Sequence, residues 1–139
     1  MKASELMSTN LVVVQMDDHL GKLKAIFEET RFHHLLVVEG ERLYGIISDR
    51  DLLKSLSPNI GTMAATTKDM ASLNKKAHQI MTRRPIFLRE DATIDDAISI
   101  FNQNKISCIP IVDNTEAPFG IISWRDIMRE IGKTLHTKH

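Results

Sequence analysis

The sequence is poor in the residues that define several classes of protein. Its single cysteine, Cys108, excludes both an internal disulfide and a zinc site built from several cysteines. The longest apolar runs, such as 11–14 and 35–38, are far too short to span a bilayer. The first ten residues, MKASELMSTN, lack the apolar segment of a secretory signal peptide. We therefore expect a cytoplasmic protein.

The chain also lacks an excess of charge of either sign. Eighteen Lys and Arg residues balance eighteen Asp and Glu residues, so we expect binding neither to nucleic acid nor to an anionic membrane surface. Hydrophobic residues make up 42% of the chain and charged residues 26%, which is ordinary for a globular protein. The 139 residues fit one compact domain or two half-domains, and a half of about 60 residues would bury too little surface to be stable alone.

One segment of the sequence occurs twice. GIISDRD at 45–51 recurs as GIISWRD at 120–126, with a single mismatch. The likeness extends over a whole unit, because apolar and acidic positions of the first half match those of the second at a nearly constant spacing. A repeat of this length is typical of a duplicated half-domain and not of a solenoid.

Each copy predicts the same order of elements, β-α-β-β-α. In the second copy, Thr93 and Asp96 have the spacing of a helix N-cap followed by an acidic N3 residue. The final helix starts near Ser123, and its apolar positions are expected to be buried, namely Trp124, Ile127, Met128, Ile131 and Leu135. We expect repeats at 1–56 and 75–137, joined by a linker at 57–74 with about one helical turn.

The ordered set of motifs, found twice, resembles the cystathionine-β-synthase (CBS) domain family. The resemblance rests on both Gly-x-x-Ser-x-x-Asp segments, on Ile109-Pro110-Ile111-Val112-Asp113, and on Met7-Ser8-Thr9 and Met81-Thr82-Arg83-Arg84-Pro85 before the first strands. It covers nearly the whole chain. It implies an α/β (α+β) fold in which two CBS repeats pack sheet to sheet with pseudo-two-fold symmetry as one Bateman module. CBS pairs commonly bind adenine nucleotides between the repeats and regulate other proteins.

The resemblance implies three groups of ligand-binding residues. The motif aspartates, Asp51 and Asp126, would hold the ribose hydroxyls. The phosphate side would comprise Ser48, Ser123, Arg50, Arg125, Thr9, Thr82, Arg83 and Arg84. The base would be bordered by Val12, Leu35, Ile86, Ile109 and Pro110. The resemblance implies no metal and no required cofactor, and S-adenosylmethionine and NAD are further candidate ligands.

Each Ser-x-x-Asp segment also has the form of a capping box, which would need no ligand. The two interpretations are compatible, because a helix N-terminus offers free N–H groups and partial positive charge to a phosphate. The copies differ after the serine, where Asp49 adds negative charge beside the first candidate site and Trp124 adds none at the second. We therefore expect the second site to bind phosphate more tightly.

Three residues belong to types that often react or bind metals, but they are expected to have structural roles, namely His33, His34 and Cys108. Adjacent side chains on an extended segment point apart, so His33 and His34 are not expected to bind a metal together. Cys108 aligns with His34 before a buried strand and is expected to act as a small hydrophobic residue.

The sequence thus predicts a non-catalytic regulatory protein that senses an adenine nucleotide, dimerises through its helices and acts on a separate, unidentified effector protein. Two alternatives stay open. One is an assembly module without a ligand. The other is a hydrolase that uses Ser48 or Ser123, although no histidine lies at a duplicated position near either serine.

Overall fold

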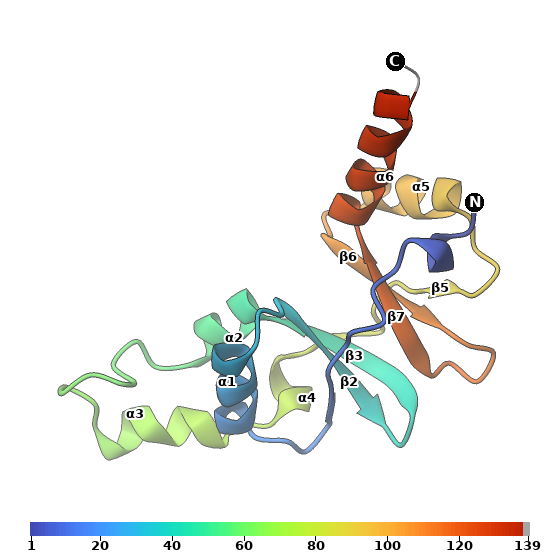
Figure 1. The fold of residues 1–139 in the computed structure, drawn as a ribbon. Coiled ribbons are helices and arrows are strands. Elements are labelled where there is room, and N and C mark those ends of the chain that lie inside the picture. Colours follow the sequence, from blue (N-terminus) through green and yellow to red (C-terminus); the bar gives the residue numbers. More distant parts are fainter. Residues whose placement is uncertain (138–139) are drawn as a thin grey trace. The chain divides into compact units, whose positions relative to one another are not determined.

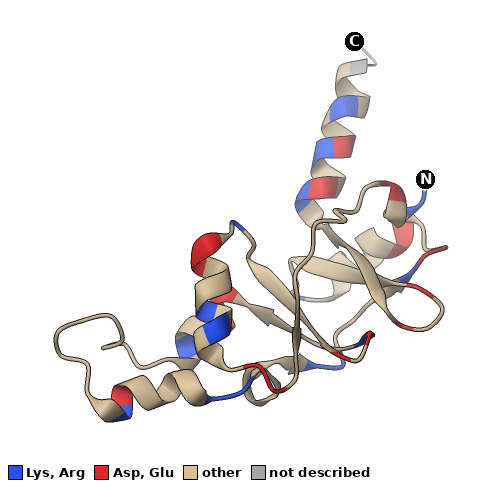
Figure 2. Cartoon of the chain, turned by 60° about the horizontal axis from the view of Figure 1, so that its bottom comes forward, with Lys and Arg blue, Asp and Glu red and all other residues tan. Residues whose placement is uncertain are grey.

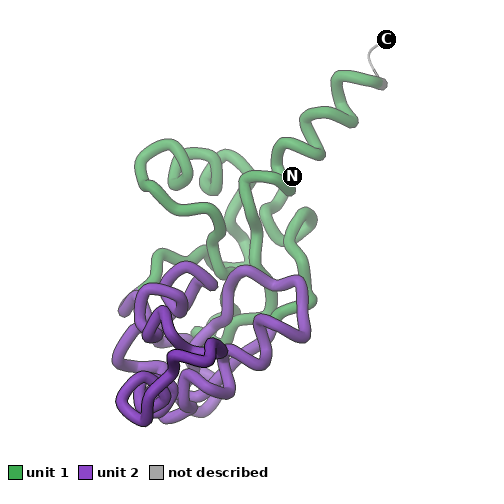
Figure 3. Tube along the Cα trace, turned by 90° about the vertical axis from the view of Figure 1, so that its left-hand side faces the viewer, with its two compact units in different colours: residues 1–11, 85–139 green, residues 12–84 purple. Residues whose placement is uncertain are grey.

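The computed structural model describes residues 1–137, and no helix within that range is long and apolar enough to cross a membrane. The chain divides into two compact units, coloured separately in Figure 3. Unit 1 contains residues 1–11 together with the chain from residue 85 onward, and unit 2 contains residues 12–84. Each unit therefore includes a lead-in segment that the sequence assigns to the other repeat.

Unit 2 is built on a four-stranded mixed sheet. β1 (Val13–Gln15) runs parallel to β2 (His34–Glu39), and β2 pairs antiparallel with β3 (Arg42–Ser48). α1 (Leu20–Glu29) connects β1 to β2, and α2 (Asp49–Ser55) follows β3 directly (Figure 1). The lead-in segment adds α4 (Ala77–Ile80) and the short edge strand β4 (Thr82–Arg83), which pairs antiparallel with β3. The predicted β-α-β-β-α order is confirmed for the first copy.

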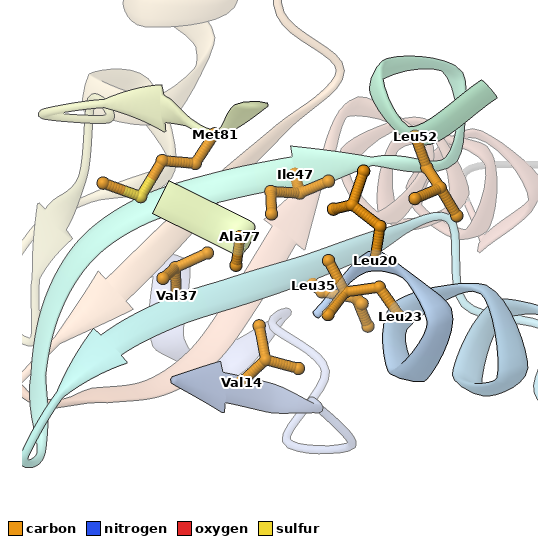
Figure 4. Close-up of a cluster of buried hydrophobic side chains, with 9 residues drawn as sticks. All are labelled: Val14, Leu20, Leu23, Leu35, Val37, Ile47, Leu52, Ala77 and Met81. Atoms are coloured by element: carbon orange, nitrogen blue, oxygen red, sulfur yellow. The ribbon is translucent and has the colours of Figure 1, made fainter. Parts of the chain in front are cut away.

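The core of unit 2 lies where the sheet meets its helices. Residue alternation along β2 sends Leu35 and Val37 to the same side, and helical spacing brings Leu20 and Leu23 onto it. Burying one such side chain stabilises the fold by about 1.5–3 kcal/mol, so this cluster is a main source of stability. Figure 4 shows its members, which are Val14, Leu20, Leu23, Leu35, Val37, Ile47, Leu52, Ala77 and Met81.

Unit 1 repeats this architecture with three strands. β5 (Leu88–Arg89) runs parallel to β6 (Cys108–Val112), which pairs antiparallel with β7 (Pro118–Ser123). α5 (Ile94–Gln103) connects β5 to β6, and α6 (Trp124–Thr137) follows β7. The lead-in segment adds a 3-10 turn, η1 (Ala3–Glu5), and a backbone bridge between Ser8 and Ile121 of β7. This bridge corresponds to the pairing of β4 with β3 in unit 2.

The helix start predicted from Thr93 and Asp96 is confirmed. The Oγ1 of Thr93 accepts a hydrogen bond from the backbone N–H of Asp96 at 3.1 Å. In return, the Asp96 carboxylate accepts one from the N–H of Thr93 at 2.9 Å. Two N–H groups that the helix leaves without partners are thereby satisfied.

The burial predicted for α6 is wrong at four of five positions. Ile127 is 5% exposed, whereas Trp124, Met128, Ile131 and Leu135 are 48%, 56%, 42% and 56% exposed. The reason is geometric, because a helix turns about 100° per residue and places Ile127 at the edge of the apolar arc that the other four share. Ile127 alone reaches the core of unit 1, and the other four form an exposed stripe.

The linker is more regular than predicted. It forms α3 (Thr67–Ala71) and η2 (Ser72–Asn74). Thr66 caps α3 by accepting from the N–H of Asp69 at 3.2 Å, and the Asp69 carboxylate also accepts from the Ser57 hydroxyl at 2.6 Å. The latter bond, followed by those from Thr66, lowers the pKa of Asp69. The capping signal is present in the sequence, but no apolar face follows it, so periodicity predicts only a single turn.

Candidate functional site

The second motif forms the junction between β7 and α6. The Ser123 Oγ accepts a hydrogen bond from the backbone N–H of Asp126 at 3.2 Å. The Asp126 Oδ2 accepts in return from the N–H of Ser123 at 2.8 Å. Its other carboxylate oxygen, Oδ1, lies 3.5 Å from the Nη1 of Arg129. The capping box therefore fixes the Asp126 carboxylate beside the start of a 14-residue helix.

The first motif forms the same capping box between β3 and α2. The Ser48 Oγ accepts from the N–H of Asp51 at 3.1 Å, and the Asp51 Oδ2 accepts from the N–H of Ser48 at 2.9 Å. The capping box of Asp51 uses its Oδ2, and the charge of Asp51 also acts on His34, which lies opposite Ser48 on the neighbouring strand. The two aspartates thus have the same capping bond but different neighbours, since Asp126 also lies beside Arg129.

The glycine of each motif is required by packing. A Cβ added to Gly120 would lie 2.8 Å from the Cγ of Met7, and one added to Gly45 would lie 2.8 Å from the Cγ of Met81. Both distances are shorter than ordinary carbon–carbon contacts. In each unit, therefore, the lead-in methionine occupies the space that a side chain at the motif glycine would need.

The remaining predicted residues are divided between the units. Unit 2 contains Val12, Leu35 and Arg50, and unit 1 contains Ile86, Ile109, Pro110 and Arg125. Thr9 belongs to unit 1, and the segment 82–84 belongs to unit 2. The backbones of Thr82 and Arg83 pair with β3, and the Arg83 guanidinium donates to the carbonyl of His78 at 3.1 Å. The assignment of Thr82, Arg83 and Arg84 to the phosphate side of a ligand site stays a prediction.

Two of the predicted base-side residues lie in the cores. Leu35 and Ile109 are both 0% exposed and pack in the core clusters of units 2 and 1. Alternation along a strand turns the next residues, Leu36 and Pro110, to the opposite face of each sheet. Leu36 and Pro110 are also less than 2% exposed, so burial does not separate the two faces of either strand. The assignment of Leu35, Ile109 and Pro110 to the base side stays a prediction.

The electrostatic difference between the motifs is modified by a histidine. The Asp49 Oδ2 lies 2.9 Å from the Nδ1 of His33, and this hydrogen bond lowers the pKa of Asp49. In the second motif, Trp124 carries no charge and the Arg125 guanidinium lies 5.8 Å from its ring centre. Basic and acidic residues alternate along α6 (Figure 2).

Within residues 1–137, no group of three or more His, Cys, Asp and Glu side chains could hold a metal ion.

Each motif serine lies opposite the first residue of the neighbouring strand. Ser48 pairs with His34 across the sheet, and Ser123 pairs with Cys108. The fold therefore places a histidine beside one serine, which the sequence could not show. The equivalent serine has a cysteine there, so the two copies do not share a serine–histidine arrangement.

Acidification is expected to destabilise the fold through His34. Burial lowers the pKa of this half-buried histidine below its ordinary value of 6.5. Its contribution to stability is present above pH 6.5 and is lost as the pH falls through the lowered pKa. Lowering the pH from about 7.5 to about 5 should decrease the melting temperature more in the wild type than in His34→Gln. An equal or greater decrease in the variant would contradict this role.

Cys108 is expected to resist thiol reagents in the native protein. It is buried, and burial raises the pKa of its thiol to about 12, which confirms its role as a small hydrophobic residue. Only the thiolate reacts, so labelling with a disulfide reagent near pH 8 should be slow and should become fast in denaturant. Native labelling as fast as in denaturant would show that the thiol is accessible.

Comparisons with known proteins identify related sequences and folds. A family model described as "CBS domain" matches residues 3–58 and 77–133. The chain is 29% identical to inosine-5'-monophosphate dehydrogenase of Methanocaldococcus jannaschii over 92% of its own length but only 23% of that enzyme. Its fold resembles the CBS domain pair of protein MJ0100 in complex with 5-methylthioadenosine and S-adenosyl-L-methionine, with a TM-score of 0.75 at 23% identity, covering 94% of this chain and 99% of the other. It also resembles CBSX2 in complex with AMP, with a TM-score of 0.77 at 22% identity, covering 99% and 98%.

Proposed function

We propose a regulatory, ligand-binding function for this chain, which belongs to the CBS domain family and carries two tandem repeats. The ligand is an adenine nucleotide, and the bound module acts on a separate effector protein. One observation carries the proposal, namely that each unit fixes a motif aspartate at the start of a helix through a capping box. A cytoplasmic location, where adenine nucleotides are abundant, is part of the proposal.

The geometry suits a ribose phosphate. A carboxylate can accept hydrogen bonds from the hydroxyls of a ribose, as in dinucleotide-binding folds. The N–H groups and partial positive charge at a helix start favour a phosphate. Asp49 opposes a phosphate at the first motif and Trp124 does not at the second, so the second motif binds phosphate more tightly. The adenine-containing ligands in the two similar structures support this class of ligand.

Regulation suits these residues better than hydrolysis. Both motif serines use their hydroxyl oxygen to accept a capping hydrogen bond from an aspartate N–H. A nucleophilic serine instead needs a neighbouring base that accepts its proton. Such a base, His34, lies opposite Ser48, whereas Ser123 lies opposite Cys108, so the two copies do not share a catalytic pair.

The proposal is tested by identifying and rebinding the ligand. Mass spectrometry of the small molecules released from the purified protein should detect an adenine compound, and calorimetry with that compound should give saturable binding. Any ligand specific for the folded state must also stabilise it, by about 2.7 kcal/mol at one hundred times its dissociation constant. If AMP, ADP, ATP, NAD and S-adenosylmethionine all leave the melting temperature unchanged, a ligand-free assembly module is the better interpretation.

We propose in addition that the chain forms a homodimer through its helices, with the exposed stripe of α6 at the contact. Trp124 and Met128 are 48% and 56% exposed and lie one helical turn apart. Replacing Met128 by lysine should convert the dimer into a monomer in sedimentation experiments, because it would bury a charge in the contact. Lys133→Ala, on the opposite side of α6, should leave the mass unchanged. A monomeric wild type would refute this assembly.

A further inference from the structure

An ionisable pair of side chains distinguishes the first motif from the second. In both units, the residue after the motif serine is held by a backbone bond to the residue before the neighbouring strand. The N–H of Asp49 donates to the carbonyl of His33 at 2.9 Å, and the N–H of Trp124 donates to that of Ser107 at 3.4 Å. In unit 2 the side chains are joined as well, because the Asp49 Oδ2 lies 2.9 Å from the Nδ1 of His33. The backbone arrangement is thus common to both copies, whereas Trp124 and Ser107 carry no charge.

The charged groups around this pair come from the start of α2 and from the first residue of β2. The charges of Asp49, Asp51 and His33 all act on His34, which opens β2. The backbone N–H of Arg50 donates a hydrogen bond to Asp49. Of these side chains, only the two histidines belong to the type that ordinarily changes its charge between about pH 8 and pH 5.

The neighbouring elements contribute charges that are paired or exposed. α1 packs against α2, and its two lysines form ion pairs within their own segment, Lys22 with Asp18 and Lys24 with Glu28. Residues 10–12, which precede β1 on the other side of β2, carry no charge. Two further charged residues between α1 and β2 are exposed, namely Glu29 and Arg31.

The two histidines differ in their surroundings. Burial lowers the pKa of His34, so on acidification it gains charge later than an unburied imidazole would. The side chain of His33 is 73% exposed, and its ring lies against Asp49. Its hydrogen bond lowers the pKa of Asp49, which therefore stays negative throughout the neutral range. A proton on His33 would place a positive charge beside this negative one and offset it.

We propose that the pair of His33 and Asp49 determines which ligand charge the first motif accepts. With His33 neutral, the motif disfavours a phosphate and favours an adenosine compound without negative charge. With His33 protonated, it accepts a phosphate. The inference rests on the proposed function, because it assumes that Asp51 binds a ribose beside this pair. Side-chain charge has a larger effect here than at the second motif, since peptide dipoles add along a helix and α2 has seven residues whereas α6 has 14.

The test is a titration of the full, ¹⁵N-labelled chain with AMP and with adenosine at low salt, at about pH 7.5 and about pH 6, on either side of the ordinary histidine pKa. The amide signals of Ser48 and Asp51 report on the first motif, and those of Ser123 and Asp126 on the second. The ratio of AMP affinity at the first motif to that at the second should rise about two- to fivefold on acidification, the effect of an exposed charge pair. Ionisation of the phosphate itself near pH 6 affects both motifs alike. The ratio for adenosine, which has no phosphate, should stay constant.

Three variants assign the effect to the pair. His33→Gln can still donate to Asp49 but gains no charge, so its AMP ratio should stay at the value found at the higher pH. Asp49→Asn should strengthen AMP binding at the first motif at the higher pH and leave adenosine binding unchanged. His19→Gln is the matched control in the same unit, because the His19 Nδ1 lies 3.1 Å from the carbonyl oxygen of Asn74. It should keep the wild-type pH dependence, and all three variants should keep the wild-type circular dichroism spectrum.

The outcomes separate this inference from the proposed function. A wild-type AMP ratio that does not change with pH, or that changes equally in His33→Gln, overturns the inference and leaves the proposed function in place. Failure of AMP to shift the first-motif signals at either pH, while it shifts those of the second, also overturns it. If neither AMP nor adenosine shifts the signals of either motif, the proposed function fails and the inference fails with it.

Discussion

Replacing Asp126 by asparagine should weaken adenine-nucleotide binding at the second motif by about 10- to 100-fold. A hydrogen bond to a charged group contributes about 1.5–3 kcal/mol, and the neutral amide would lose that strength toward a ribose hydroxyl. The amide oxygen can still accept from the N–H of Ser123, so the capping box would largely persist. Calorimetry at constant ionic strength measures the loss. Binding within twofold of wild type would remove Asp126 from the site.

Asp96→Asn is the matched control for this experiment. Asp96 occupies the same N3 position in a capping box with Thr93, but it lies at the start of α5 and outside both motifs. The two substitutions should change the melting temperature by similar amounts, while only Asp126→Asn changes affinity. Equal loss of affinity in both variants would indicate a structural cause.

Asp51→Asn extends the comparison to the first motif. The sequence difference between Asp49 and Trp124 predicts a smaller loss there, because the first site binds phosphate less tightly. The structure adds an opposing factor, since the Asp126 Oδ1 lies 3.5 Å from the Nη1 of Arg129, which competes with a ligand for that oxygen. A greater loss in Asp51→Asn than in Asp126→Asn would show that access to the carboxylate outweighs the charge of Asp49.

Replacing Gly120 by alanine should destabilise the fold by about 1–3 kcal/mol, the usual cost of forcing an extra carbon into a packed site. The added Cβ would lie 2.8 Å from the Cγ of Met7, so that the methionine would have to move away from β7. Denaturant-induced unfolding measures this change in free energy. The comparison requires that the unfolding free energy depend equally on denaturant concentration in both variants.

A second glycine-to-alanine substitution, with the opposite expected effect on stability, serves as the control. Gly132 lies inside α6, and nothing lies within 4 Å of the position that its Cβ would take. Gly132→Ala should therefore stabilise the helix by roughly 0.5–1 kcal/mol. In the double variant Met7→Ala/Gly120→Ala, part of the cost should disappear, because the clashing side chain is gone. Strict additivity would mean that Met7 is not the obstacle.

The sequence predicted those parts of the site that depend on near neighbours. Ser123 and Asp126, like Thr93 and Asp96, are three residues apart, so their mutual hydrogen bonds follow from the start of a helix. The order of strands and helices follows from apolar periodicity within each copy. The same reasoning failed for Trp124 and Met128, because periodicity defines an apolar arc but not how much of it the core covers.

The sequence by itself therefore determined the duplication, the family and the two capping boxes, since each is written in short spacings that occur twice. Only the tertiary structure decided which lead-in segment joins which motif strand. Ser8 bonds with Ile121 and Arg83 pairs with Gly45, and no local pattern encodes a backbone pairing between distant segments. The structure thereby also explained the glycine shared by both motifs, which makes room for a methionine from the lead-in segment of the other repeat.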